Sequence, residues 1–168
     1  VESLAVVDIL RRAGVETVTV GVSHKSEIIS AQNITVRADR MLDEEDYTDA
    51  DIVFLPGGMP GTRNLEADEK VLNIVKKQYE SGKIVTAICA APSILGHLNI
   101  LQGKKATCYP GFEKDLYGAK LMTERVVEDG NVITSRGMGT AVDLGLALVE
   151  RLLGREASEK IASGIQYR

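Results

Sequence analysis

The chain has 168 residues, of which 44% are hydrophobic and 26% are charged. These proportions are typical of a globular protein with a sizeable core, so residues 1–168 are predicted to form a single domain. A formal net charge of -4 and an aromatic content of 4% provide neither a basic surface for phosphates nor stacking platforms for bases, which excludes nucleic acid as an expected partner. The sequence has no apolar run of about 18 residues and no signal-like start, so no membrane partner is expected and the expected compartment is the cytoplasm.

The cysteines and histidines exclude several kinds of site. Cys89 and Cys108 are the two cysteines, and because they make no disulfide framework, both are expected to be reduced thiols. His24 and His97 do not have the spacing of zinc ligands, so no metal is expected. No other cofactor is expected.

The first third of the chain predicts a helix followed by short strands. Apolar residues recur at helical spacing at Leu4, Val7, Leu10 and Ala13. Gly14 follows as a C-cap. The β-branched run 15–22 predicts a strand, and residues 27–29 and 34–36 predict a short hairpin. The acidic stretch 43–46 is a solvated loop or a short helix.

Strands and helices then alternate, which predicts right-handed βαβ crossovers and a parallel sheet. The apolar run 52–55 is typical of a strand buried on both faces. Helices are predicted at about 68–81, 90–97, 141–153 and 156–163, and strands at 84–88, 105–108, 125–127 and 132–134. Asp129-Gly130 joins the last two strands as a hairpin, and Thr140 with Asp143 resembles a capping box for the helix that Gly154 closes.

Cys89 lies between the predicted strand 84–88 and the predicted helix that starts at Ala90. A strand that passes directly into a helix places the junction residue in a tight turn, side chain outward, beside unpaired helical N–H groups. Positive potential at a helix start lowers the pKa of a cysteine, and the thiolate is the nucleophile. The alternative is that Cys89 is there for packing, since free cysteines are among the most buried residues.

Three predicted strands end in small residues: Pro56-Gly57-Gly58, Cys89-Ala90-Ala91 and Ser135-Arg136-Gly137-Met138-Gly139. The carboxyl ends of parallel strands gather at one edge of an open sheet, where ligands bind, so these three loops are expected to meet. Glycine lets a backbone N–H point freely at an oxygen, which makes Gly58 and Ala90 candidates for an oxyanion hole. The alternative for Gly57-Gly58 is a simple tight turn.

The same segments carry a resemblance to a known family. The motifs are Leu55-Pro56-Gly57-Gly58, Ala87-Ile88-Cys89-Ala90-Ala91-Pro92 and Thr134-Ser135-Arg136-Gly137-Met138-Gly139-Thr140. In this order they resemble the signatures of the ThiJ/PfpI superfamily, and the closest branch is that of Parkinson disease protein 7. The resemblance runs nearly end to end. It implies an α/β fold of the flavodoxin-like type, a three-layer sandwich with a mostly parallel central sheet, a nucleophile-elbow cysteine at Cys89 and a homodimer.

The resemblance also implies roles for further residues. In this family a glutamate of the first loop hydrogen-bonds the cysteine sulfur, and the match places that role on Glu2, which on composition alone is an acid near a helix start. Tyr109 stands where many relatives have a histidine, so it joins Gly57 and Gly58 as a candidate for substrate binding, and proton shuttling falls to Glu2 or water. Arg136 is expected to hold an anion or brace the dimer interface, with a surface salt bridge as the alternative.

Other positions depart from the family pattern. Ala90 stands where the protease-like branch has a histidine, which argues against a Cys-His peptidase, and His97 is expected to be structural. Gln32 replaces an arginine that close relatives often carry, so anion binding there is expected to be weaker. The family normally opens with a core strand before the glutamate. We therefore expect roughly 15 further residues before Val1 in the native protein, forming a parallel strand without which runs 18–22 and 84–88 lose a neighbour.

Two hypotheses of function follow. The first is a cofactor-independent cysteine enzyme that acts on reactive carbonyls, a glyoxalase III-like conversion of methylglyoxal or glyoxal to a hydroxy acid, or a protein deglycase, with a small aldehyde as the substrate. Cys89 and Glu2 are then catalytic, and Gly58 and Ala90 stabilise the oxyanion. The second is a redox-sensing stress-response protein or holdase chaperone in which Cys89 is oxidised to a sulfinic acid. Both use the same pocket.

Overall fold

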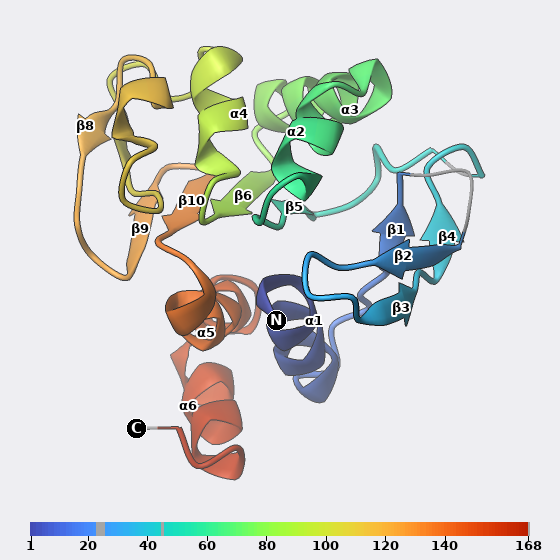
Figure 1. The fold of residues 1–168 in the computed structure, drawn as a ribbon. Coiled ribbons are helices and arrows are strands. Elements are labelled where there is room, and N and C mark those ends of the chain that lie inside the picture. Colours follow the sequence, from blue (N-terminus) through green and yellow to red (C-terminus); the bar gives the residue numbers. More distant parts are fainter. Residues whose placement is uncertain (23–25, 45, 168) are drawn as a thin grey trace.

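The protein folds into three layers, with a central sheet between two layers of helices (Figure 1). The fold was obtained as a computed structural model, which describes residues 1–22, 26–44 and 46–167. One helical layer consists of α1 (Glu2–Arg12), α5 (Ala141–Leu153) and α6 (Arg155–Gly164). The other consists of α2 (Gly61–Glu66), α3 (Glu69–Glu80) and α4 (Pro92–His97). The predicted α/β sandwich is confirmed.

The central sheet brings the ends of three parallel strands to one edge. Its order is β5 (Ile52–Leu55), β6 (Ile84–Ile88), β10 (Val132–Ser135) and β9 (Val126–Asp129). β5, β6 and β10 run parallel, and β9 is antiparallel to β10. Leu55 lies opposite Ala87, and Ser135 lies opposite Ile88, so the loops that follow these strands all leave the sheet on the same side.

The remaining strands form separate pairs. β1 (Val20–Gly21) and β4 (Arg40–Met41) are parallel, β2 (Glu27–Ile29) and β3 (Thr35–Arg37) form a hairpin, and β7 (Lys105–Ala106) pairs with β8 (Lys120–Leu121). The hairpin agrees with the sequence apart from a shift of one residue in its second strand. The strands predicted at 15–22 and 105–108 shorten to two residues each, because strand length depends on a partner that local sequence does not reveal.

The core lies on both faces of β6. Val85 and Ala87 belong to the cluster beneath α3 and α4, whereas Ile88 belongs to the cluster with α1 and α5. The predicted apolar face of α1 was wrong in part. Its buried side chains are Val6, Ile9 and Leu10, while Leu4 is 44% exposed. The true face follows the spacing of three and four residues that meets α5.

The expectation that the run 84–88 lacks a neighbour is wrong, because β6 has β5 on one side and β10 on the other. Among the described residues, the two edge strands of this sheet are β5 and β9. The strand expected to precede residue 1 stays a prediction.

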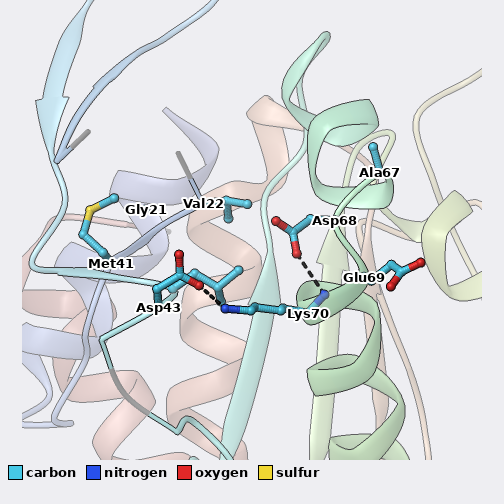
Figure 2. Close-up of a pocket in the computed structure, with 9 residues that line it drawn as sticks. Gly21, Val22, Met41, Asp43, Ala67, Asp68, Glu69 and Lys70 are labelled. Atoms are coloured by element: carbon cyan, nitrogen blue, oxygen red, sulfur yellow. Dashed lines mark hydrogen bonds and ion pairs between the residues drawn. The ribbon is translucent and has the colours of Figure 1, made fainter. Parts of the chain in front are cut away.

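A cavity of 540 Å³ lies between the β1–β4 pair and the start of α3 (Figure 2). Lys70 and Asp43 form an ion pair across it, and Asp68 caps α3 by accepting hydrogen bonds from the N–H groups of Lys70 and Val71 at 2.9 and 3.2 Å. The N-cap fixes where α3 begins. None of the predicted site residues lines this cavity.

The capping box predicted for α5 is wrong. Thr140 precedes the helix but makes no side-chain cap hydrogen bond, and the Asp143 carboxylate instead accepts from Arg125 at 2.7 Å and from the hydroxyl of Tyr167 at 2.5 Å. Gly154 ends α5 with a φ of 88°, as expected. No helix in the described part of the chain has the length and apolar character needed to cross a membrane.

Candidate functional site

Cys89 occupies a sharp turn between β6 and α4. Its φ is 64°, in the left-handed region that residues with a side chain seldom adopt. Two backbone hydrogen bonds hold the turn: the N–H of Cys89 donates to the carbonyl of Ser135 at 3.0 Å, and its own carbonyl accepts from the N–H of Tyr109 at 2.8 Å. Backbone strain of this kind concentrates at functional sites, and the geometry is that of a nucleophile elbow.

Gly57 and Glu2 meet Cys89 from the end of β5 and the start of α1. A Cβ placed on Gly57 would lie 2.5 Å from Cβ of Cys89 and 2.8 Å from Oε2 of Glu2. Only glycine fits here, because any side chain would overlap both the cysteine and the carboxylate. The Glu2 side chain is also hydrogen-bonded to Cys89. Thus the structure brings Glu2 to the sulfur, where the family match places it.

Gly58 and Ala90 present backbone N–H groups to the sulfur of Cys89. These are the two amides expected to form an oxyanion hole, and Gly58 has a φ of 87°, a conformation that favours glycine. Both hydrogen bonds lower the pKa of Cys89, but burial and then the negative charge of Glu2 outweigh them and raise that pKa to about 11. The expectation that the pKa of Cys89 is lowered is therefore wrong. α4 begins at Pro92 rather than at Ala90, so the elbow receives two amides and not a full helix start.

Tyr109 and Gly137 close the other side of the cysteine. A Cβ on Gly137 would lie 3.3 Å from the ring of Tyr109 and 3.9 Å from Sγ of Cys89. The Tyr109 side chain is 51% exposed, so the phenol stands at the entrance and not in the core. Substrate contact by Tyr109 stays a prediction that this position allows.

Arg136 and His97 point elsewhere. The guanidinium of Arg136 donates to the carbonyl of Thr123 at 3.3 Å, toward the connection between β8 and β9. Its expected role in a dimer or in anion binding stays a prediction. His97 lies at the end of α4, where it pairs with Glu66 and its ring lies 4.9 Å from that of Tyr117 at a tilt of 51°, which agrees with the structural role expected for it. His24 lies outside the described residues, and Gln32 is exposed in the β2–β3 turn.

One part of the site was not singled out from the sequence. The loop after β10 is tied by side-chain hydroxyls: Ser135 Oγ lies 2.7 Å from Thr140 Oγ1, which accepts from the N–H of Gly137 at 3.1 Å. This network holds Gly137 against the sulfur and explains why Thr140 does not cap α5. The sequence does carry a signal for this hydroxyl network, because Ser135 and Thr140 flank the two glycines of the motif.

Metal binding finds no support in the part of the chain that the structure describes, where no three His, Cys, Asp or Glu side chains converge. The chemistry available at Cys89 is that of a thiol, a carboxylate and two amide donors. This set is suited to nucleophilic attack on a polarised carbon, with proton transfer through the carboxylate.

A flavodoxin-like α/β sandwich with a cysteine in a left-handed turn between strand and helix defines the class of this protein. The model of the DJ-1/PfpI family matches residues 1–151, and the chain belongs to that family. It is 38% identical over 156 residues to Protein DJ-1 homolog B of Arabidopsis thaliana, which is 92% of this chain and 36% of the relative. The solved structure of oxidized Toxoplasma gondii DJ-1 has a TM-score of 0.95 at 31% identity, covering 99% of this chain and 91% of that chain.

One of the relatives is named as an enzyme. Isonitrile hydratase of Pseudomonas putida is 32% identical over 125 residues, which is 73% of this chain and 54% of the relative. The chain thus spans little more than a third of the Arabidopsis relative and about half of this one. Family membership is established by these matches, and the reaction is not.

Proposed function

We propose that the protein is a cofactor-independent cysteine enzyme that acts on small reactive carbonyls, above all 2-oxoaldehydes. The observation that carries the proposal is the group of contacts at the sulfur of Cys89: a hydrogen bond to the Glu2 carboxylate and N–H donors from Gly58 and Ala90. A nucleophile, a base and an oxyanion hole are thus within reach of one carbon atom.

The first step is attack of Sγ on the aldehyde carbon. Glu2 accepts the thiol proton as the C–S bond forms, which compensates for a pKa that burial and the Glu2 charge hold at about 11. The aldehyde oxygen becomes the oxyanion and accepts from the N–H groups of Gly58 and Ala90, then takes a proton to give a hemithioacetal. The positive φ of Cys89 aims the sulfur out of the turn toward this carbon.

Glu2 then moves a proton between the two carbons. Its carboxylate removes the proton from the sulfur-bearing carbon, and the neighbouring carbonyl oxygen takes up a proton to give an enediol. The proton held by Glu2 then returns to the neighbouring carbon, and the hydroxyl on the sulfur-bearing carbon loses its proton, which gives a thioester of a 2-hydroxy acid. Water attacks the thioester carbon, and the thiol of Cys89 leaves with a proton. The net change is addition of one water to the oxoaldehyde. Because Tyr109 replaces the histidine of many relatives, these proton transfers fall to Glu2.

Methylglyoxal turnover without glutathione or metal tests the proposal. The native sequence and Cys108→Ser are expected to form the hydroxy acid, and Cys89→Ser is not. Release of early methylglyoxal adducts from a model peptide, in the same set of variants, separates deglycase from glyoxalase activity. Equal turnover in the native and Cys89→Ser proteins would remove the nucleophile from the proposal, and no turnover by the native protein would remove the substrate class.

A redox-sensing or chaperone function is the second candidate, because the amides of Gly58 and Ala90 that face the sulfur also suit the oxygens of a sulfinate. A solved relative, Toxoplasma gondii DJ-1, is described as oxidized. In this case two equivalents of hydrogen peroxide each transfer one oxygen atom to Cys89 and leave as water. Intact mass after peroxide treatment tests it: a gain of two oxygen atoms on Cys89, with no methylglyoxal turnover before oxidation, would favour the sensor.

The proposal includes a homodimer in the cytoplasm, as the family resemblance implies. Exposed apolar side chains support an interface, since Ile29 is 68% and Ile34 58% exposed at the β2–β3 hairpin. Sedimentation at micromolar concentration tests the dimer, and Ile29→Lys is expected to weaken it if the hairpin takes part.

A further inference from the structure

Exposed apolar residues occur in three loops whose backbones meet Cys89. Met59 follows Gly58 after β5 and is 38% exposed, Tyr109 is 51% exposed, and Met138 follows Gly137 after β10 and is 62% exposed. We call Met59, Tyr109 and Met138 the apolar rim. Large apolar side chains left in water at one place indicate a surface that binds something.

Each methionine of the apolar rim follows a glycine that lies close to the sulfur of Cys89. The N–H of Gly58 donates to Sγ of Cys89, and a Cβ on Gly137 would lie 3.9 Å from the same sulfur. Each methionine is therefore the next residue along the chain, about 3.8 Å away in Cα position, from a glycine at the sulfur. The ring of Tyr109 lies 3.3 Å from the Cβ position of Gly137, which completes the third side.

Charge is scarce around this entrance. The loop segments 56–60, 89–91, 108–112 and 136–139 contain one charged residue, Arg136, whose guanidinium donates to the carbonyl of Thr123. Glu2 supplies the charge used in the chemistry at the sulfur. The loops around Cys89 therefore offer a substrate mainly apolar side chains. Methionine side chains are flexible and polarizable, and they favour contact with aromatic groups.

We propose that the apolar rim selects carbonyl substrates that carry an apolar substituent, so that aryl or branched-alkyl 2-oxoaldehydes are preferred to methylglyoxal. This specificity rests on the proposed carbonyl function. The reacting aldehyde sits at Cys89, and the substituent on the second carbon packs on Met59, Tyr109 and Met138. A hydrophobic pocket discriminates by about tenfold or more when a substrate gains apolar contact of this size.

Steady-state kinetics with phenylglyoxal and methylglyoxal test the preference. The native protein is expected to favour phenylglyoxal in kcat/KM by about tenfold or more, and Met138→Gln or Met59→Gln to reduce this ratio several-fold, mainly through KM. Leu153→Gln is the matched control, because Leu153 is 50% exposed at the far end of α5. A ratio near one in the native protein, or one that neither rim variant changes, would overturn the proposal.

Alkylation of Cys89 tests the rim without any turnover, so failure of the rim is distinguished from failure of the reaction. The probes are iodoacetamide and its N-benzyl derivative, with the adduct located by mass spectrometry. The benzyl reagent is expected to react faster than iodoacetamide after correction for its rate with free cysteine, and Met138→Gln is expected to remove this advantage. Equal corrected rates overturn the proposal. So does a Met138→Gln variant that weakens a dimer and leaves the rate ratio intact, because the rim is then an interface between copies.

Discussion

Cys89 and Cys108 lie in neighbouring segments, since the N–H of Tyr109 donates to the carbonyl of Cys89, but their surroundings differ. Burial raises the pKa of both thiols to about 11, and in each case a nearby carboxylate adds to the shift, Glu2 for Cys89 and Glu113 for Cys108. Cys108 is 3% exposed within the core cluster beneath α4. Cys89 is partly exposed in a left-handed turn and receives hydrogen bonds from two backbone amides.

The pKa of a resting thiol does not by itself identify the nucleophile. Two cysteines with similarly raised pKa values can still differ in two ways. A substrate carbon reaches only an exposed sulfur, and the substrate oxygen that becomes charged needs hydrogen-bond donors nearby. Cys89 has Glu2, Gly58 and Ala90 in these roles. Cys108 has a packed core around it.

The largest expected effect is loss of activity when the sulfur of Cys89 is removed. Cys89→Ser is expected to lower methylglyoxal turnover by about 10⁴-fold or more, because the nucleophile is lost, whereas Cys108→Ser keeps it. Iodoacetamide near neutral pH is expected to label Cys89 at least about tenfold faster than Cys108, as mapped by mass spectrometry. Faster labelling of Cys108 would reverse the comparison between the two thiols.

Glu2→Gln is expected to lower turnover by about a hundredfold or more, since the amide cannot carry a proton between the two carbons. Alkylation of Cys89 is expected to be retained or faster, because removing the Glu2 charge lowers the pKa of the thiol. Kinetics and labelling on the same preparation give both values, and Asp8→Asn on the same helix is the control, since Asp8 pairs with Arg12 away from the site. Turnover equal to that of the native protein would exclude Glu2 as the proton carrier.

Gly57→Ala is expected to cost about 1–3 kcal/mol of unfolding free energy and to disrupt the pair of Glu2 and Cys89, because the new methyl group would overlap both. Gly139→Ala is the matched control, since a Cβ there meets nothing within 4 Å. Urea unfolding measures the stability of each variant. If both glycine variants unfold at the same urea concentration, the close approach at Gly57 is not present in solution.

Local sequence predicted much of the framework. Strand 84–88 and helix α3, which was predicted at about 68–81, were found because a β-branched run and an apolar period are local signals. The elbow at Cys89 was also found, because a strand run meets small residues and a proline there. Helix α2 was missed, since six residues are too few to show a period.

The errors came from contacts between distant segments. The buried face of α1 depends on α5, where a Cβ on Gly145 would lie 2.8 Å from the Ile9 side chain, and Leu4 turns away from that contact. The direction of the Cys89 pKa shift depends on burial and on Glu2, which is separated from Cys89 by about half of the chain. Neither the buried face of α1 nor the pKa shift of Cys89 follows from a local pattern. The family resemblance did place Glu2 at the sulfur.

The smallest expected effect concerns the stability of the fold in alkali, and it arises from Cys108. Its pKa in the folded state is raised to about 11 from an ordinary value of 9.0, by burial first and then by Glu113, so the folded state favours the neutral thiol. The resulting stabilisation is fully present below about pH 9 and is lost as the pH rises toward about 11, because the unfolded chain ionises first.

The loss from this one thiol is expected to be up to about 2 kcal/mol. Urea unfolding at about pH 8 and about pH 11 measures it in a Cys89→Ser background, which removes the contribution of the other thiol. Cys108→Ala in that background is less stable at neutral pH because it leaves a cavity, so the comparison is made between the two pH values within each variant. A smaller alkaline loss in Cys108→Ala confirms that burial of this thiol, and not a general effect of alkali on lysine and tyrosine, carries the difference. Equal losses with and without the Cys108 sulfur would show that the core thiol is open to hydroxide, and the contrast between a packed cysteine and a reactive one would then rest on the amides of Gly58 and Ala90 alone.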